Sequence, residues 1–153
     1  MAASLLTGAL KLGIECCRRG DWNEGMHHLG RIAERGESDL PGLFYSYLGY
    51  GIALREHRFQ EGLKLCRHSI KLEFYQVENY LNLARTCILA KDRKGAVRAI
   101  RGGLKVDPHN PELLVLYKDL GIRGLPVLPF LDRAHFLNQL LGRFRHAWRG
   151  SRP

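Results

Sequence analysis

The sequence predicts an all-α fold, an α-solenoid in which three helix pairs stack along one axis. Internal repetition is the first observation, because three segments of similar length align over about residues 6–39, 43–76 and 77–110. Within each segment an apolar-periodic helix, a short polar turn and a second apolar-periodic helix follow one another. Each pair leaves one apolar face uncovered, so it must stack on the next pair, and the three pairs share one quasi-linear core.

The turns and their spacing define the repeat. They read RRGD, REHR and AKDR, at residues 18–21, 55–58 and 90–93. Gly62 and Ala96 occupy equivalent places and lie 34 residues apart, a period typical of helix-pair repeats. Gly25 precedes Gly62 by 37 residues, and the linker DLPG accounts for the three extra residues.

Small residues are placed where the two helices of a pair should cross. Gly13 and Gly25, and likewise Ala84 and Ala96, are twelve residues apart across a turn. Small side chains at such a crossing let two backbones approach closely. In the second repeat Gly49 falls one residue out of this register, so the facing of that repeat's first helix stays open.

A seventh helix should close the stack. Residues 112–120, ELLVLYKDL, follow a proline and carry apolar side chains that can cover the open end, and Gly121 is suited to end the helix. We therefore expect one domain over residues 1–120.

Residues 121–153 depart from the repeat. Pro126 and Pro129 bar a helix through LPVLPF and favour an extended apolar strap. Asp132 can cap a following helix over about residues 133–148. The apolar side of that amphipathic helix comprises Phe136, Leu137, Leu140, Leu141, Phe144 and Trp148. These six side chains could dock on the solenoid itself, on a partner protein or second copy, or on an anionic membrane.

Charge and cysteine usage bear on partners and compartment. The net charge is +9, and residues 121–153 hold six arginines against one acid, so the tail is strongly basic. A basic surface of this kind suits an acidic partner. The four cysteines form no CxxC pair, which favours buried thiols in a reducing compartment. No secretory signal or membrane-spanning run is expected, and we predict a cytoplasmic protein, with peripheral membrane attachment as an alternative.

Over residues 6–110, the repeated pattern of small, aromatic and apolar residues resembles that of a tetratricopeptide repeat (TPR) protein. The third segment carries the pattern best, with Tyr80, Leu83, Ala84, Cys87, Ala96, Ile100 and Pro108. The first supplies Leu12, Gly13, Trp22, Gly25 and Leu29, and the second supplies Phe59, Gly62 and Cys66.

The resemblance implies a concave groove, lined by the first helices of the pairs, that receives a peptide. The residues expected there are Leu10, Ile14, Arg18, Tyr47, Tyr50, Leu54, Asn82 and Arg85. Core packing is the alternative for the two tyrosines. The Lys and Asn set with which chaperone-binding TPR proteins grip a C-terminal carboxylate is not reproduced, since Ile14 and Leu48 stand at its asparagine positions.

A second candidate surface is basic. Lysines and arginines recur at helical spacing on the second helices of two repeats, and the apolar residues between them should face inward, which places the basic residues on the convex side. They are Lys64, Arg67, Lys71, Lys94, Arg98, Arg101 and Lys105. The alternatives are a solvated face and a docking surface for an acidic protein, phosphates or anionic lipid. Nucleic acid is disfavoured because no aromatic residues are interleaved with the basic ones.

Catalysis is not indicated. The sequence has no phosphate-binding loop and no GxGxxG, and adjacent His27 and His28 point in different directions on a helix. We expect no catalytic residues, no metal and no cofactor. The predicted function is a non-catalytic adaptor that binds a protein or peptide segment through the concave face. The alternatives are a peripheral membrane-surface protein anchored by the C-terminal helix and a chaperone for a secreted or assembly substrate.

Overall fold

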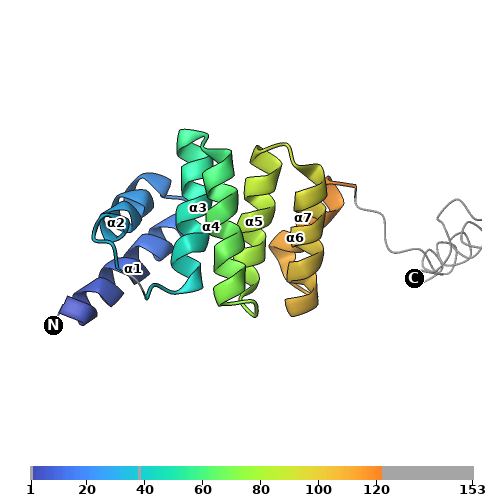
Figure 1. The fold of residues 1–153 in the computed structure, drawn as a ribbon. Coiled ribbons are helices and arrows are strands. Elements are labelled where there is room, and N and C mark those ends of the chain that lie inside the picture. The colour runs from blue at the N-terminus through green and yellow to red at the C-terminus, as the bar shows by residue number, and fades with distance from the viewer. Residues whose placement is uncertain (1, 38, 122–153) are drawn as a thin grey trace, which may run out of the picture. The chain divides into compact units, whose positions relative to one another are not determined.

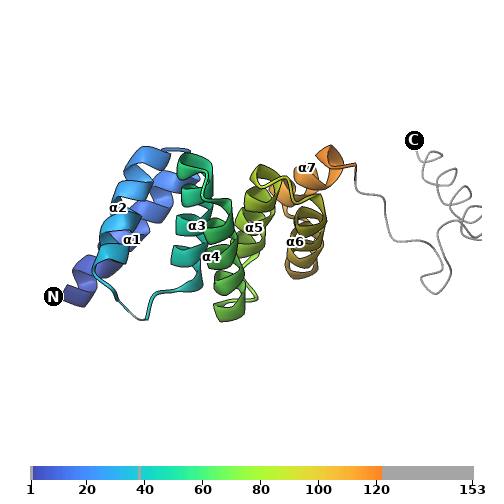
Figure 2. The same ribbon diagram turned by 45° about the horizontal axis from the view of Figure 1, so that its top comes forward.

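The computed structural model describes residues 2–37 and 39–121, and these form seven α-helices without a strand. The helices are α1 (Ala2–Arg18), α2 (Trp22–Glu34), α3 (Gly42–Glu56), α4 (Phe59–Leu72), α5 (Val77–Leu89), α6 (Arg93–Val106) and α7 (Pro111–Asp119). Consecutive helices stand side by side in a row (Figures 1 and 2). The predicted all-α solenoid is confirmed.

The packing follows the predicted pairs. Helix α1 packs on α2, α3 on α4, and α5 on α6, while α1 with α3 and α3 with α5 join successive pairs. Helix α7 packs on α6 at the end of the stack. Its N-terminus is capped by the side chain of Asn110, which accepts a hydrogen bond from the Leu113 backbone N–H, and Gly121 takes the left-handed conformation (φ 54°) just after its end.

The three intra-pair turns share one backbone feature. Gly20, His57 and Lys91 all have positive φ, and each lies five residues before the small residue at the crossing. In the first and third turns an aspartate then caps the second helix: Asp21 accepts from the Glu24 N–H and Asp92 from the Gly95 N–H. These turns fix the antiparallel geometry of each pair.

Gly49 is the crossing residue of the second pair. A Cβ added to Gly62 would lie 2.5 Å from the Gly49 carbonyl oxygen, just as one on Gly25 would lie 3.0 Å from the Gly13 carbonyl oxygen. Gly49 is therefore the spatial counterpart of Gly13, and the extra residue lies between Gly49 and the turn. Because one residue rotates a helical side chain by about 100°, Tyr50 is turned away from the crossing.

The four cysteines are buried and unpaired. Burial is the main cause that raises the pKa of Cys17 and of Cys66 to about 12, and that of Cys87 to about 11. These thiols are protonated at neutral pH, so they act as small apolar core residues. Burial of the cysteines was predicted and is confirmed.

The chain divides into two units, Met1–Leu120 and Gly121–Pro153. The predicted strap and C-terminal helix, with the docking residues from Phe136 to Trp148, lie outside the described residues. Within the described part, no helix is both long and apolar enough to cross a membrane.

Candidate functional site

An apolar groove opens between α1 and α3. Its volume is about 580 Å³, and we call it the α1–α3 groove. Apolar side chains from both helices line it, namely Leu12, Ile14 and Leu43, together with Lys11, Glu15 and Arg18. Leu12 is 47% exposed, which is unusual for a leucine beside a packed core. The groove thus offers apolar surface that this part of the chain leaves uncovered.

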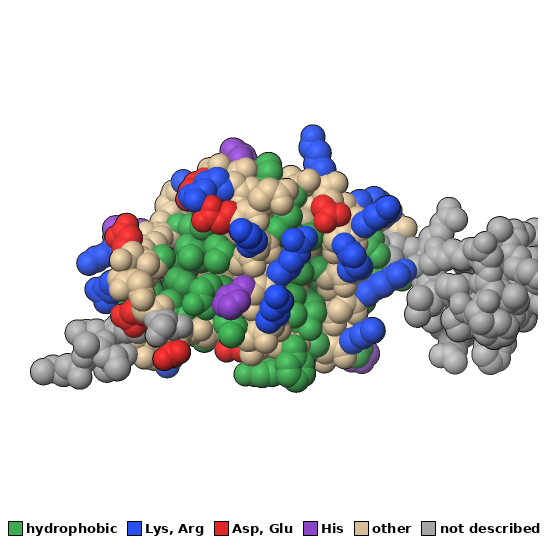
Figure 3. Space-filling model, viewed as in Figure 1, with side chains coloured by type: hydrophobic (Ala, Val, Ile, Leu, Met, Phe, Trp, Pro, Cys, Tyr) green, Lys and Arg blue, Asp and Glu red, His purple; other side chains and the backbone are tan. Residues whose placement is uncertain are grey.

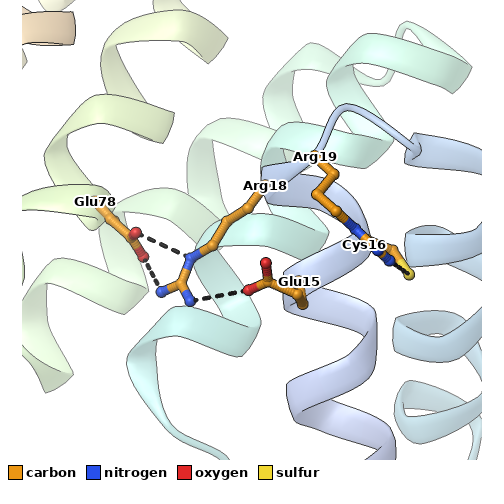
Figure 4. Close-up of polar contacts among 5 residues, drawn as sticks. All are labelled: Glu15, Cys16, Arg18, Arg19 and Glu78. Carbon is orange, nitrogen blue, oxygen red and sulfur yellow. Dashed lines mark hydrogen bonds and ion pairs between the residues drawn. The ribbon is translucent and has the colours of Figure 1, made fainter.

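Arg18 lines the groove and forms an ion pair that joins α1 to α5. From the end of α1 it reaches the start of α5, where its Nε and Nη2 donate to the two carboxylate oxygens of Glu78 at 3.1 and 2.8 Å (Figure 4). Its Nη1 also lies 3.6 Å from Oε2 of Glu15. The hydrogen bonds to Glu78 are the main cause that raises the pKa of Arg18. Such a two-point pair fixes both position and orientation.

Arg85 forms a second ion pair between helices, through one nitrogen–oxygen contact. It pairs with Glu112 of α7, and its guanidinium lies over the Tyr50 ring, 5.8 Å from the centroid. Arg85 thereby joins α3, α5 and α7.

An aromatic cluster lies between the first two pairs. The ring centroid of Trp22 lies 4.9 Å from that of Tyr50, edge to face, and 6.2 Å from that of Tyr47, stacked. Burial raises the pKa of Tyr47 to about 12 and also raises that of Tyr50, so both hydroxyls are protonated at neutral pH. The cluster anchors α2 on α3.

The predicted groove residues separate into two groups. Four are buried and contribute to the core: Leu10, Ile14, Tyr47 and Asn82. Asn82 is only 1% exposed, and its side-chain amide donates to the Ser46 hydroxyl at 3.0 Å. Ile14 still forms part of the groove lining. The accessible four are Arg18, Tyr50, Leu54 and Arg85, and both arginines already have carboxylate partners.

The Lys and Asn set that grips a terminal carboxylate is replaced at two positions by apolar side chains. Ile14 and Leu48 are both buried and apolar, so neither can donate a hydrogen bond to a terminal carboxylate.

The predicted basic surface lies on α4 and α6. Lys64, Arg67, Lys71, Lys94, Arg98 and Lys105 are exposed, whereas Arg101 is half-buried. Figure 3 shows Lys and Arg side chains gathered over these two helices, with hydrophobic side chains between them.

Several site residues were missed by sequence reasoning. Glu78 pairs with Arg18 and Glu112 with Arg85, but the partners are 60 and 27 residues apart in the chain, so no local spacing reveals them. Leu12 was predicted only as part of the repeat pattern, and Leu43 was not predicted as a site residue.

The chain is similar to known proteins in its fold. No protein-family model and no curated protein sequence matches the chain. Among solved structures, the chain is similar to the Arabidopsis OM64 TPR domain, with a TM-score of 0.61 and 18% identity, covering 76% of this chain and 94% of that one. The described helices have the TPR fold.

A second similar structure is a TPR domain with a bound peptide. It is the second TPR domain of human RPAP3 in complex with an HSP70 peptide, with a TM-score of 0.58 and 11% identity, covering 77% of this chain and 99% of that one. The TPR fold that the repeats predicted is thus confirmed, and α1, α3 and α5 are the first helices of its three pairs.

Proposed function

We propose that this protein is a non-catalytic adaptor that binds an apolar segment of a partner protein in the α1–α3 groove. One observation carries the proposal: the groove is lined by Leu12, Ile14 and Leu43, and its Arg18 is paired with Glu15 and with Glu78 of α5. Because Arg18 is held by Glu78 and Glu15, it adds no unbalanced charge for a ligand to neutralise. Affinity then comes from burial of apolar surface.

Preorganisation supports the same function. The Arg18–Glu78 pair links α1 to α5, and the contacts of Arg85 link α5 to α3 and α7. A groove whose walls are fixed before binding loses less conformational entropy when a segment docks. The peptide bound to the similar human TPR domain supports the proposal in a general way, since it shows that this fold can present a peptide-binding surface.

The partner segment should be apolar at its centre and nearly neutral. A segment with a terminal carboxylate as its main anchor fits less well, because the buried Ile14 and Leu48 supply no donors. An aliphatic or aromatic side chain that covers Leu12 fits better, because it removes exposed apolar surface from water.

The proposed binding site is tested by introducing a charged side chain into the groove. The full chain and its Leu12→Glu variant are each used to isolate partners, and a partner that binds the wild-type chain saturably is then titrated against both by calorimetry. Loss of leucine burial together with desolvation of a carboxylate should cost about 2 kcal/mol, roughly a 30-fold rise in Kd.

Val115→Glu is the matched control. Val115 is also an exposed apolar residue (56%), but it lies on α7 outside the groove lining. It should leave the Kd within about twofold of wild type. Equal affinity of the Leu12→Glu variant and the wild-type chain would refute the groove as the binding site.

A further inference from the structure

A second cleft lies between α4 and α6, on the face with the basic residues. Its volume is about 370 Å³, and we call it the α4–α6 cleft. Both helices pack on α5, which supplies Tyr80, Leu83 and Cys87 to the lining, and α4 adds Ile70. The apolar lining is therefore recessed between two helices.

The lips of this cleft are basic on both sides. Arg67 of α4 and Arg98 of α6 are exposed and line it directly. Lys64 and Lys71 continue the α4 side, and Lys94 and Lys105 the α6 side, at spacings that keep them on one face of each helix.

Acids near the cleft do not neutralise these side chains. Helix α6 contains none, and Asp92 at its N-terminus is used as a cap. At the start of α4, Glu61 pairs with Arg58. Among the described residues, neither Arg67 nor Arg98 has a carboxylate partner, in contrast to Arg18 and Arg85 in the row of first helices.

An exposed apolar patch adjoins one end of the cleft. It consists of Leu72, Phe74 and Tyr75, which are 46, 68 and 62% exposed. Tyr80, whose ring lines the cleft, donates from its hydroxyl to the Phe74 carbonyl oxygen at 3.0 Å, so the patch and the cleft are adjacent.

Hydrogen bonds hold the loop that presents the patch. The Asn79 side-chain amide donates to the carbonyl oxygens of Ser69 and Glu73, at 3.3 and 3.1 Å, and is fully buried. The exposed rings of Phe74 and Tyr75 also pack edge to face, with centroids 5.8 Å apart. Their exposure is thus built into an ordered turn, and exposed apolar patches of this kind mark interaction sites.

We infer that the α4–α6 cleft and the Leu72–Tyr75 patch together bind an acidic amphipathic segment of a partner protein. Its apolar side chains enter the cleft and cover the patch, while its carboxylates face the basic lips. Lys94 to Lys105 spans eleven residues, about 16 Å of helix, which matches roughly three turns of a docked helix. This surface is separate from the α1–α3 groove, and the inference does not depend on the function proposed there.

Other occupants fit less well. A bilayer would cover the exposed Phe74 and Tyr75 but would leave Ile70, Leu83 and Cys87 uncovered, because these three are recessed between the basic helices. A second copy of the chain, at net charge +9, would be repelled electrostatically. A partner segment with carboxylates around an apolar centre complements both the shape and the charge of the cleft.

An unbiased selection tests this inference. The full chain is panned against a phage-displayed library of random peptides about twelve residues long, and the most enriched peptide is synthesised with a fluorescent label for polarisation measurements. We expect Asp and Glu to flank Leu, Ile or Phe in that peptide. In the Arg67→Glu/Arg98→Glu variant its Kd should rise at least about tenfold, because two attractions become repulsions.

Matched variants separate this cleft from net charge and from the groove. Arg31→Glu/Lys118→Glu makes the same change in charge at exposed positions on α2 and α7, and should change the Kd less than about twofold. Leu12→Glu should have as little effect. Phe74→Ser/Tyr75→Ser removes the two aromatic residues of the patch without altering charge, and should weaken binding about threefold or more. Far-UV circular dichroism and thermal unfolding verify that each variant is folded.

Three outcomes would overturn the inference. The first is enrichment of no peptide, or of peptides without acidic residues. The second is a Kd that Arg67→Glu/Arg98→Glu leaves unchanged. The third is binding by this face to phosphatidylserine vesicles or to oligouridine, abolished by the same double substitution, in place of peptide binding.

Discussion

The helix crossing at Gly49 and Gly62 makes a quantitative prediction about stability. In Gly62→Ala the new Cβ would lie 2.5 Å from the Gly49 carbonyl oxygen, 2.9 Å from the Ala53 Cβ and 3.3 Å from Cγ2 of Thr86. The first two contacts come from α3 and the third from α5, so α4 cannot relieve one without meeting another. Moving the helices apart should cost about 3 kcal/mol, the upper part of the range for overpacked cores.

Helix propensity acts in the opposite direction. Replacing glycine by alanine within a helix stabilises it by about 1 kcal/mol. We therefore expect Gly62→Ala to lower the free energy of unfolding by about 2 kcal/mol. Urea denaturation of the full chain, monitored by far-UV circular dichroism, measures this difference. The urea concentration at the midpoint of unfolding should fall, while the slope of the unfolding free energy against urea concentration stays unchanged.

Gly30→Ala is the control. Gly30 lies inside α2, and an added Cβ would meet nothing within 4 Å. This variant should be more stable than the wild-type chain by about 0.5–1 kcal/mol. If Gly62→Ala were instead as stable as Gly30→Ala, the α3–α4 crossing would not lie at Gly49 and Gly62.

Three further predictions concern the ion pair, the thiols and the tail. A double-mutant cycle of Arg18→Ala and Glu78→Ala should give a coupling free energy of about 0.5–1 kcal/mol, because these side chains are 42 and 29% exposed. This coupling should fall with added salt. A coupling of zero would show that the ion pair does not stabilise the walls of the groove. The pKa values of Cys17 and Cys66 rise on folding from 9.0 to about 12, so the native state keeps protons that the unfolded state loses. The two protonated thiols therefore contribute fully to the free energy of unfolding below about pH 9, and this contribution is lost as pH rises towards 12. If the thiols of the native chain reacted with Ellman's reagent at pH 8 as fast as those of the urea-unfolded chain, this prediction would be contradicted. Deletion of residues 131–153 should leave co-sedimentation with anionic vesicles unchanged, and a loss of co-sedimentation would favour the membrane-anchored alternative.

The repeat was predictable because its determinants are local. Polar turns, apolar periodicity and small residues twelve apart are all visible in the sequence, and each pair depends mainly on its own two helices. In the second pair, these local signals did not determine how the first helix faces the second. Whether Gly49 or Tyr50 faced the crossing depended on one extra residue within α3, and only the contact between Gly49 and Gly62 decides it.

The candidate sites were less predictable because they depend on how pairs sit relative to one another. Arg18 was expected to meet a ligand, yet the packing brings Glu78 of α5 within reach of it. Asn82 was expected at the surface, yet Ser46 holds its amide in the core. The basic residues of α4 and α6 were visible as helical stripes, but the apolar cleft between them arises only from the spacing of two helices on α5.

Binding of a partner segment in the α1–α3 groove can be located residue by residue with nuclear magnetic resonance. The isotope-labelled full chain is titrated with the purified partner segment, and the backbone amide shifts are followed. We expect saturable shifts that centre on Lys11–Glu15 and Leu43 and that Leu12→Glu abolishes. Shifts that leave these residues unmoved, while the segment binds with the same affinity, would contradict it.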